Sequence, residues 1–374
     1  MVRVKAAFEK MLHTQEPGLF VSLVLLPLWL CSVLFCIVAA ARAKLYACGL
    51  LTSRQLPCRV VTIGNITVGG TGKTPTVSLV AQAFADAGLA TAVLSRGYGG
   101  TSRVPLIVSD RDTVLANVRQ AGDEPFMLAQ ILSGIPVITS RDRYRGGMLA
   151  CERFNPHVLV MDDGFQHLRL RRDLDIVLIN ARNPFGCGAL LPRGILREPV
   201  GALRRARIII ITKVDPHRDP EELQYRLADI NPAAKVFLAR FKPTALLHPV
   251  SGKNVEFEVV RGCIAAGLCS IGDPGNFFSM LADLGVSYSR PLIFPDHHRY
   301  SAHDFRLIAG RAGAVDYLIT TQKDIAKMSF DMLQIPNLLV LQVRQAIDEY
   351  DCFMRLVFEC LGLPAHDEPP GARR

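Results

Sequence analysis

The sequence lacks the patterns that mark zinc modules, disulfide scaffolds and the common nucleic-acid-binding modules. Its ten cysteines include no C-x-x-C pair, and the chain has no helix-turn-helix signature and no aromatic RNA-binding motif. Scattered thiols are typical of reduced core residues in a cytosolic compartment. Internal repeats and low-complexity tracts are also absent, and 374 residues suffice for two modest globular domains.

Acidic residues are fewer than basic ones, 34 against 43, which gives a formal net charge of +9. A basic chain suits an anionic partner, either nucleic acid or a membrane surface together with a phosphorylated substrate. Because no nucleic-acid motif accompanies the charge, we expect membrane lipids and no nucleic acid.

A glycine-rich turn between a β-branched run and a helical pattern is the most informative feature of the chain. Residues 60–63 form the expected strand, residues 67–74 have the sequence TVGGTGKT, and a helix is expected over 74–87. Glycines let backbone N–H groups converge on phosphate oxygens, and the helix N-terminus adds partial positive charge. Lys73 would reach the outer phosphates, and the Thr74 hydroxyl would ligate Mg²⁺. The predicted nucleotide-binding residues are Thr67, Val68, Gly69, Gly70, Thr71, Gly72, Lys73 and Thr74.

This turn departs from the P-loop pattern G-x-x-x-x-G-K-[ST] at its first position, where the chain has Thr67. The alternative to a P-loop is an ordinary glycine-rich turn that carries a lysine by chance. The preceding strand, the following helix and the Gly-Lys-Thr in register favour binding of a nucleoside triphosphate.

An uncharged stretch from Pro17 to Ala41 precedes the turn. Residues 18–41 are long enough to span or deeply enter a bilayer, and lipid-embedded helices tolerate a kink such as Pro27 would produce. The alternatives are a buried core helix and a cleaved signal peptide, but a signal peptide usually has a shorter apolar stretch, and export would separate the P-loop from its nucleotide. We therefore expect residues 1–50 to form an N-terminal segment with a membrane-anchor helix at about 18–41.

Beyond the anchor, apolar β-rich runs alternate with helical patterns, as is typical of a mostly parallel α/β sheet flanked by helices. The expected strands are 60–63, 91–94, 136–139, 158–161, 175–179 and 208–212, and the expected helices are 74–87, 124–132 and 143–153. A second alternation begins near residue 242, with strands at 255–260, 263–266, 317–320 and 337–343. We predict a P-loop NTPase-like domain over 51–244, a smaller α/β domain over 245–363 and a disordered tail over 364–374.

Two adjacent carboxylates, Asp162 and Asp163, end one apolar strand. This is the Walker B arrangement, which holds Mg²⁺ opposite the P-loop threonine; plain turn residues are the alternative. Gln166 and His167 follow closely enough to line the same pocket.

Other polar motifs leave more than one role open. Asp123, before an apolar helix, is either an N-cap or a base that accepts a proton from an attacking hydroxyl. Arg96, in a glycine-rich loop, would meet phosphate. Glu198 lies in a loop with two arginines, which would bind metal or anion or cap neighbouring elements. The sequence Asp296-His297-His298 pairs imidazoles with a carboxylate, which suits general-base chemistry near neutral pH.

The rival interpretation is a membrane-tethered GTPase. Residues 212–215 have the sequence TKVD, which resembles the guanine-binding motif of GTPases. A similar TQKD recurs at 321–324, which lowers the specificity of the motif.

The ordered set of motifs resembles the tetraacyldisaccharide 4′-kinase family, the lipid A 4′-kinases of Gram-negative bacteria. The matching segments are Gly64-Asn65 with residues 69–75, SRGYG at 95–99, GDEP at 122–125, DDGFQH at 162–167, LREP at 196–199 and DHH at 296–298. The resemblance covers about residues 55–330. The family's loop does not keep the first Walker glycine, so Thr67 fits it, whereas residues 269–274 match the family's Gly-Ile-Gly-Asn-Pro only loosely.

The resemblance implies transfer of the ATP γ-phosphate to the 4′-hydroxyl of a tetraacyldisaccharide 1-phosphate, at the cytoplasmic face of the bacterial inner membrane. It also implies that Asp123 is the base and that His297 tunes it, with His298 left open as a substitute. Asp162, Asp163 and Glu198 would surround Mg²⁺, with Gln166 close by.

Overall fold

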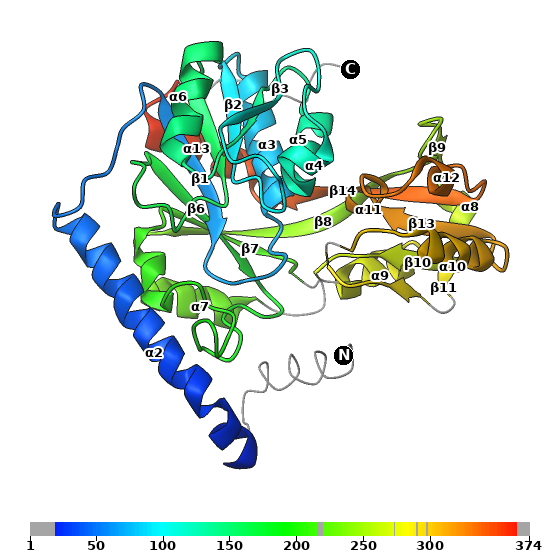
Figure 1. The fold of residues 1–374 in the computed structure, drawn as a ribbon, viewed down its shortest axis with the longest axis horizontal. Coiled ribbons are helices and arrows are strands. Elements are labelled where there is room, and N and C mark those ends of the chain that lie inside the picture. The colour runs from blue at the N-terminus through cyan, green and yellow to red at the C-terminus, as the bar shows by residue number, and fades with distance from the viewer. Residues whose placement is uncertain (1–18, 215–219, 273, 289–290, 297, 365–374) are drawn as a thin grey trace.

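The computed structural model describes residues 19–214, 220–272, 274–288, 291–296 and 298–364. Figure 1 shows two lobes joined by a pair of long strands, and one long helix that extends away from the larger lobe. We call the part that contains the glycine-rich turn the P-loop lobe and the part built from β9–β13 with α8–α12 the second lobe.

The P-loop lobe is built on a mostly parallel sheet in which the strands lie in the order β3-β4-β2-β5-β1-β6-β7-β8. Their bounds are β1 Arg59–Asn65, β2 Thr91–Ser95, β3 Leu106–Ser109, β4 Val137–Thr139, β5 Val158–Asp162, β6 Leu174–Asn180, β7 Ile208–Thr212 and β8 Lys235–Leu247. All six strands expected in this lobe are present, because both faces of each are covered and the sequence is almost continuously apolar. In the register of β1 and β5, Ile63 pairs with Asp162, so the glycine-rich turn and the paired acids leave the same edge of the sheet.

Helices cover both faces of this sheet (Figure 1). They are α3 Lys73–Asp86, α4 Val118–Ala121, α5 Asp123–Ile131, α6 Arg143–Phe154 and α7 Glu221–Ile230, with a 3₁₀ turn at Val200–Arg205. The last helix, α13 Tyr350–Leu361, returns to this lobe, where Phe358 packs edge-on against Phe84 of α3 at 5.4 Å between ring centroids. Residues of α13 share one buried cluster with α3 and β1, so the end of the smaller domain expected over 245–363 belongs to the P-loop lobe.

The second lobe is smaller and has its own buried clusters. It contains β9 Asn254–Val255, α8 Phe257–Val260, β10 Ile264–Cys269, α9 Pro274–Asp283, β11 Ser287–Tyr288, β12 Leu292–Ile293, α10 Ala302–Ala312, β13 Tyr317–Thr321, α11 Gln322–Ile325 and α12 Phe330–Leu333. The strand expected over 255–260 is wrong: only Val255 belongs to a strand, and residues 257–260 form a helical turn. Burial of Val260 in the lobe's core outweighs the β propensity of this valine-rich run.

Two long antiparallel strands connect the lobes, β8 and β14 Leu338–Ile347. They make one continuous 14-stranded sheet out of both lobes, and they cross from left to right in Figure 1. The domain boundary expected at 244 therefore falls inside β8. That strand was not predicted, because only one of its faces is buried over much of its length and the apolar signal is interrupted by Lys242, Pro243 and Thr244.

The long helix α2, Leu19–Ala47, leaves most of its apolar side chains uncovered. By length and composition, Leu25–Ala47 is able to cross a membrane. Leu34 is 64% exposed, which excludes the buried core helix weighed above. The helix is nevertheless attached to the P-loop lobe, because the buried Ser32 donates to the carbonyl oxygen of Leu190 (2.8 Å) and accepts from the N–H of Arg193 (2.9 Å).

Candidate active site

A cavity of about 1940 Å³ lies where the two lobes and α2 meet. Its lining includes the glycine-rich turn, Asp162 and Asp163 from the P-loop lobe, Gly272 and Asp296 from the second lobe, and Phe35, Val38 and Arg42 from α2. Parallel strands bring ligand-binding loops together at their carboxyl ends, and this cavity occupies that edge.

The glycine-rich turn is fixed by contacts that glycine and small polar residues alone permit. Gly72 has φ +85°, and a Cβ there would lie 2.9 Å from the ring of Phe241. The amide of Asn65, at the end of β1, donates to the Thr71 hydroxyl (2.9 Å) and accepts from Lys73 Nζ (3.3 Å). These contacts hold the turn in shape and place Lys73 at the start of α3.

The paired acids at the end of β5 have opposite environments. Asp162 is fully buried, and burial together with the negative charges of Glu124 and Asp163 raises its pKa to about 7. Burial disfavours ionisation of Asp163 as well, but Lys73 (3.6 Å) and Arg197 (2.9 Å) lower its pKa below the ordinary range. At neutral pH, the Asp163 carboxyl is therefore ionised. The pKa of Asp162 lies close to neutral pH, so its protonated and ionised forms are both populated.

The donor set fits a magnesium ion bound in the manner of a P-loop enzyme. Oδ2 of Asp162 accepts from Ser95 (2.9 Å), but its buried Oδ1 has no hydrogen-bond partner in the described structure. The buried Thr74 lines the same cavity. No cluster of three His, Cys, Asp or Glu side chains suited to a metal occurs among residues whose placement is described. Mg²⁺ typically uses one or two carboxylates together with substrate phosphates and water, so a larger protein cage is not required.

Glu198 lines the cavity, but its charge is already paired. Its Oε2 accepts from Arg205 at 2.6 Å, and that guanidinium lies 4.3 Å over the ring of Phe165. Gln166 donates to the carbonyl oxygen of Asn65 (2.8 Å), which ties the loop after Asp163 to the glycine-rich turn. The exposed Arg96 also lines the cavity.

Asp123 begins α5 as its first helical residue, and the N-cap is Gly122, so the N-cap role considered for Asp123 is wrong. Gly122 has φ +92°, and a Cβ there would come within 2.3 Å of the Tyr98 carbonyl oxygen. The glycine motifs at 97–100 and 122 thus pack backbone against backbone, which fixes the start of α5. Glu124, the next residue, lines the cavity.

The histidine motif is only partly visible, since His297 lies outside the described residues. Its neighbour His298 faces Asp304, with Nε2 at 3.0 Å from Oδ2, and stacks on Phe294. Although burial opposes it, hydrogen bonds from Ser301 and His298 lower the pKa of Asp304 to about 2. Neither His298 nor Asp123 is among the described residues that line the cavity, and the contacts of His298 are with Asp304, Phe294 and Tyr300 of the second lobe.

Comparison with known proteins identifies the family. A model of the tetraacyldisaccharide-1-P 4′-kinase family matches residues 24–359. The chain belongs to this family. It is 39% identical to the tetraacyldisaccharide 4′-kinase of Syntrophus aciditrophicus over 332 residues, which are 86% of this chain and 88% of that protein. It is 40% identical to the Geobacter metallireducens enzyme of the same name, over 82% and 89% of the two chains.

A solved structure agrees with this membership. LpxK from Aquifex aeolicus in complex with ATP superposes with a TM-score of 0.72 at 32% identity, covering 90% of this chain and 98% of that one. The predicted fold class and activity are therefore confirmed: the chain is an ATP-dependent kinase of lipid A biosynthesis. The GTPase interpretation loses its support, although Thr212 does hold the P-loop by donating to the Thr71 carbonyl oxygen (2.9 Å). Asp215, the last residue of that motif, lies outside the described residues.

Two residues at or near the site of this 4′-kinase were not predicted. Arg143, in α6, is 3% exposed, and burial with the nearby charge of Arg96 lowers its pKa to about 10 even though Asp162 and Asp163 oppose that shift. Gln345, on β14, lines the cavity and accepts from Thr76 at 2.6 Å, while its buried Nε2 has no partner within the described ranges. Neither residue lies in a glycine-rich or acidic motif, so no local signal marks them.

Proposed function

We propose that this chain transfers the γ-phosphate of ATP to the 4′-hydroxyl of a tetraacyldisaccharide 1-phosphate with the aid of Mg²⁺. The observation that carries the proposal is the shared cavity, which is lined by the glycine-rich turn, by Asp162 and Asp163, by the first turn of α5 and by the apolar side of α2. A phosphate donor and a lipid-borne acceptor thus have access to one space.

Residues 67–74 would hold the triphosphate. Backbone N–H groups of the turn and the N-terminus of α3 supply positive partial charge, and Lys73 supplies a full one. Because Asn65 and Asp163 already contact Lys73, its ammonium is oriented before the nucleotide arrives. Preorganised charge of this kind is the main means of accelerating phosphoryl transfer.

Mg²⁺ would be held by Thr74 and by the unpartnered Oδ1 of Asp162, with phosphate oxygens and water completing its shell. Such an ion neutralises charge on the transferring phosphoryl group. Asp163 would act mainly by fixing Lys73 and Arg197, with which it is already paired. Glu198, whose charge is paired with Arg205, would act on the ion through water.

Asp123 would act as the general base, with His297 tuning it. A sugar hydroxyl is barely ionised at neutral pH, so a positioned acceptor for its proton helps as the new bond develops. The start of α5 is fixed by the contact of Gly122 with the 97–100 loop. A fixed helix start suits the base role of Asp123, because a base must be held in position relative to the hydroxyl group.

The acceptor would enter from the membrane. Phe35 and Val38 of α2 line the cavity while keeping exposed apolar surface, and Arg42 lies one turn further along the same lining. Acyl chains would remain in the bilayer with α2, and the disaccharide headgroup would reach the site. ATP is cytosolic, so the lobes would lie on the cytoplasmic face of the inner membrane.

The replacement Asp123→Ala tests the role of the base. We expect kcat for the lipid acceptor to fall by about 10²–10⁴-fold with the Kd for ATP nearly unchanged, because the base acts in the transition state. The matched control is Asp229→Ala, which changes an exposed aspartate on α7. Turnover by Asp123→Ala at the level of the control would exclude Asp123 as the base.

A further inference from the structure

The second TQKD sequence, residues 321–324, occupies a defined place that the nucleotide-binding site does not explain. It ends β13 and forms α11, and the Thr321 hydroxyl caps that turn by accepting from the N–H of Asp324 (3.2 Å). This segment lies in the second lobe, at the side that faces α5 (Figure 1).

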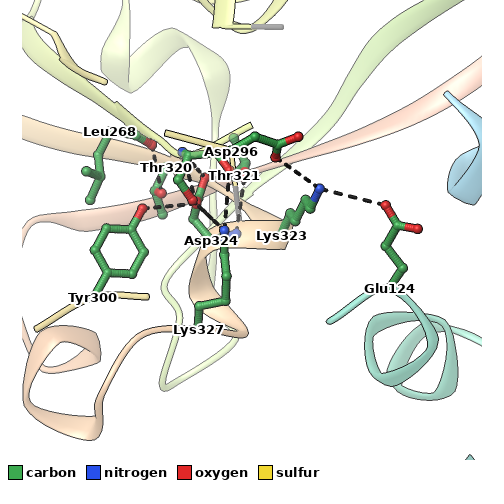
Figure 2. A network of polar contacts seen from close by, with 10 residues as sticks. Glu124, Leu268, Asp296, Tyr300, Thr320, Thr321, Lys323, Asp324 and Lys327 are labelled. Atoms are coloured by element: carbon green, nitrogen blue, oxygen red, sulfur yellow. Dashed lines mark hydrogen bonds and ion pairs between the residues drawn. The ribbon is translucent and has the colours of Figure 1, made fainter. Parts of the chain in front are cut away.

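Asp324 is fully buried and surrounded by donors, as Figure 2 shows. Its carboxylate accepts from the Ser270 N–H (3.0 Å), the Tyr300 hydroxyl (2.9 Å) and the Thr321 hydroxyl (2.7 Å), and Lys327 Nζ lies 3.2 Å away. A buried carboxylate with this many partners holds its surroundings rigidly. Asp324 therefore ties α11 to the end of β10 and to the loop that carries Tyr300.

Lys323, the preceding residue, points away from this network and into the cavity. Its Nζ lies 3.4 Å from Asp296 Oδ1, in the second lobe, and 3.8 Å from Glu124 Oε1, in the P-loop lobe. One ammonium thus joins acidic side chains of the two lobes across the cavity. The backbones of the two lobes also approach each other close by. A Cβ added to Gly272, in the second lobe, would lie 3.5 Å from the N atom of Gly70 in the glycine-rich turn and 3.1 Å from the side chain of Asp296.

Removing that ammonium would take away the cation that joins Glu124 and Asp296. Two carboxylates that one ammonium contacts repel each other when that ammonium is removed. Glu124 follows Asp123 directly in the first turn of α5, so its displacement would move the proposed base.

We propose that Lys323 is a positioning residue, which holds the second lobe against the first turn of α5 and thereby sets the place of Asp123 for phosphoryl transfer. The proposal rests on the proposed function of Asp123. Asp324 supports it by fixing the turn from which Lys323 extends.

The test compares Lys323→Met with Lys323→Arg and with the control Lys253→Met, which removes an exposed lysine in the loop just before β9. Misplacing a reacting group by about 1 Å costs roughly 10²-fold in rate, so for Lys323→Met we expect kcat to fall by about 10–100-fold. The Kd for ATP should change by less than about threefold, since the glycine-rich turn is untouched. Lys323→Arg, which keeps the charge, should recover most of the rate.

A second measurement does not depend on activity. Deuterium uptake by α5, where the Phe126 N–H bonds to the Gly122 carbonyl oxygen, should rise in Lys323→Met and stay at the wild-type level in Lys253→Met. Unchanged uptake in α5 would overturn the proposal, as would a kcat within about twofold of wild type in an active enzyme. If wild-type protein phosphorylates no lipid but uptake still rises, the contact between the lobes stands and the proposed function fails.

Discussion

The buried Asp162 allows a quantitative prediction. Its pKa is raised from 3.8 to about 7 by burial and by Glu124 and Asp163, and each unit of pKa corresponds to about 1.4 kcal/mol. The folded protein therefore binds a proton that the unfolded chain has released, and the stability of the metal-free protein falls as the pH rises from about 4 to about 7. The full cost above pH 7 is at most about 4 kcal/mol, of which roughly 3 kcal/mol develops between pH 5 and pH 8.

The replacement Asp162→Asn removes this titration while keeping the shape of the side chain. The new amide keeps an acceptor for Ser95 but places a donor where Oδ1 has no partner, which costs roughly 1–3 kcal/mol at every pH. We therefore expect the free energy of unfolding of the variant, relative to wild type, to improve by roughly 3 kcal/mol between pH 5 and pH 8. The measurement is urea unfolding in detergent micelles with a metal chelator present.

The control is Asp163→Asn, because the pKa of Asp163 is shifted downward, opposite to that of Asp162. The pKa of Asp163 is lowered by Lys73 and Arg197 despite burial, so its contribution to stability is present above pH 4 and is lost only at lower pH. This variant should be less stable than wild type at both pH 5 and pH 8. The difference should be smaller at pH 8, because the charge of Asp163 is one of those that raise the pKa of Asp162, but the change with pH should be smaller than for Asp162→Asn. Parallel pH profiles for wild type and Asp162→Asn would refute the assignment of Asp162 as a buried, weakly acidic group.

Three further outcomes are expected. Mg²⁺ should tighten ATP binding to wild type and have little effect on Asp162→Asn, because the variant lacks the free carboxylate oxygen; titration calorimetry with and without Mg²⁺ measures this. Lys73→Ala should lose both ATP affinity and turnover while staying folded, since Asp163 keeps Arg197 at 2.9 Å; retained turnover would contradict a P-loop role. The double variant Leu30→Glu, Leu34→Glu changes two positions on α2 that are 56% and 64% exposed, and it should reduce sedimentation of the protein with vesicles, because an acidic residue costs up to about 3 kcal/mol at the bilayer centre. The Kd for ATP should be unchanged. Undiminished sedimentation would argue against α2 as the anchor.

The sequence was sufficient for those parts of the fold that local patterns specify. The P-loop strand, the α3 helix and the strand ending in Asp162 were predicted to within two residues at each end, because doubly buried strands are continuously apolar and glycine-rich turns are conspicuous. The long strand β8 and the return of α13 to the P-loop lobe were not predicted. Both depend on pairing or packing between segments about 100 to 270 residues apart, as with Phe84 and Phe358.

The site, too, could be predicted from the sequence only where a local motif marks its residues. Lys73 and Asp162 occur in recognisable motifs, whereas the pairing of Glu198 with Arg205 and the bridge of Lys323 to Glu124 become visible only in three dimensions. The family resemblance implied that Glu198 lies around Mg²⁺, and the structure shows that its carboxylate is paired with Arg205. Arg143 had no motif at all, because its importance comes from burial near the paired acids.

Incubation of purified full-length protein with labelled ATP, Mg²⁺ and a tetraacyldisaccharide 1-phosphate tests the assigned chemistry most directly. We expect label to appear in a bisphosphorylated lipid, with Asp123→Ala forming almost none of it. Failure of the wild-type protein to label the lipid, together with hydrolysis of GTP in preference to ATP, would contradict a 4′-kinase.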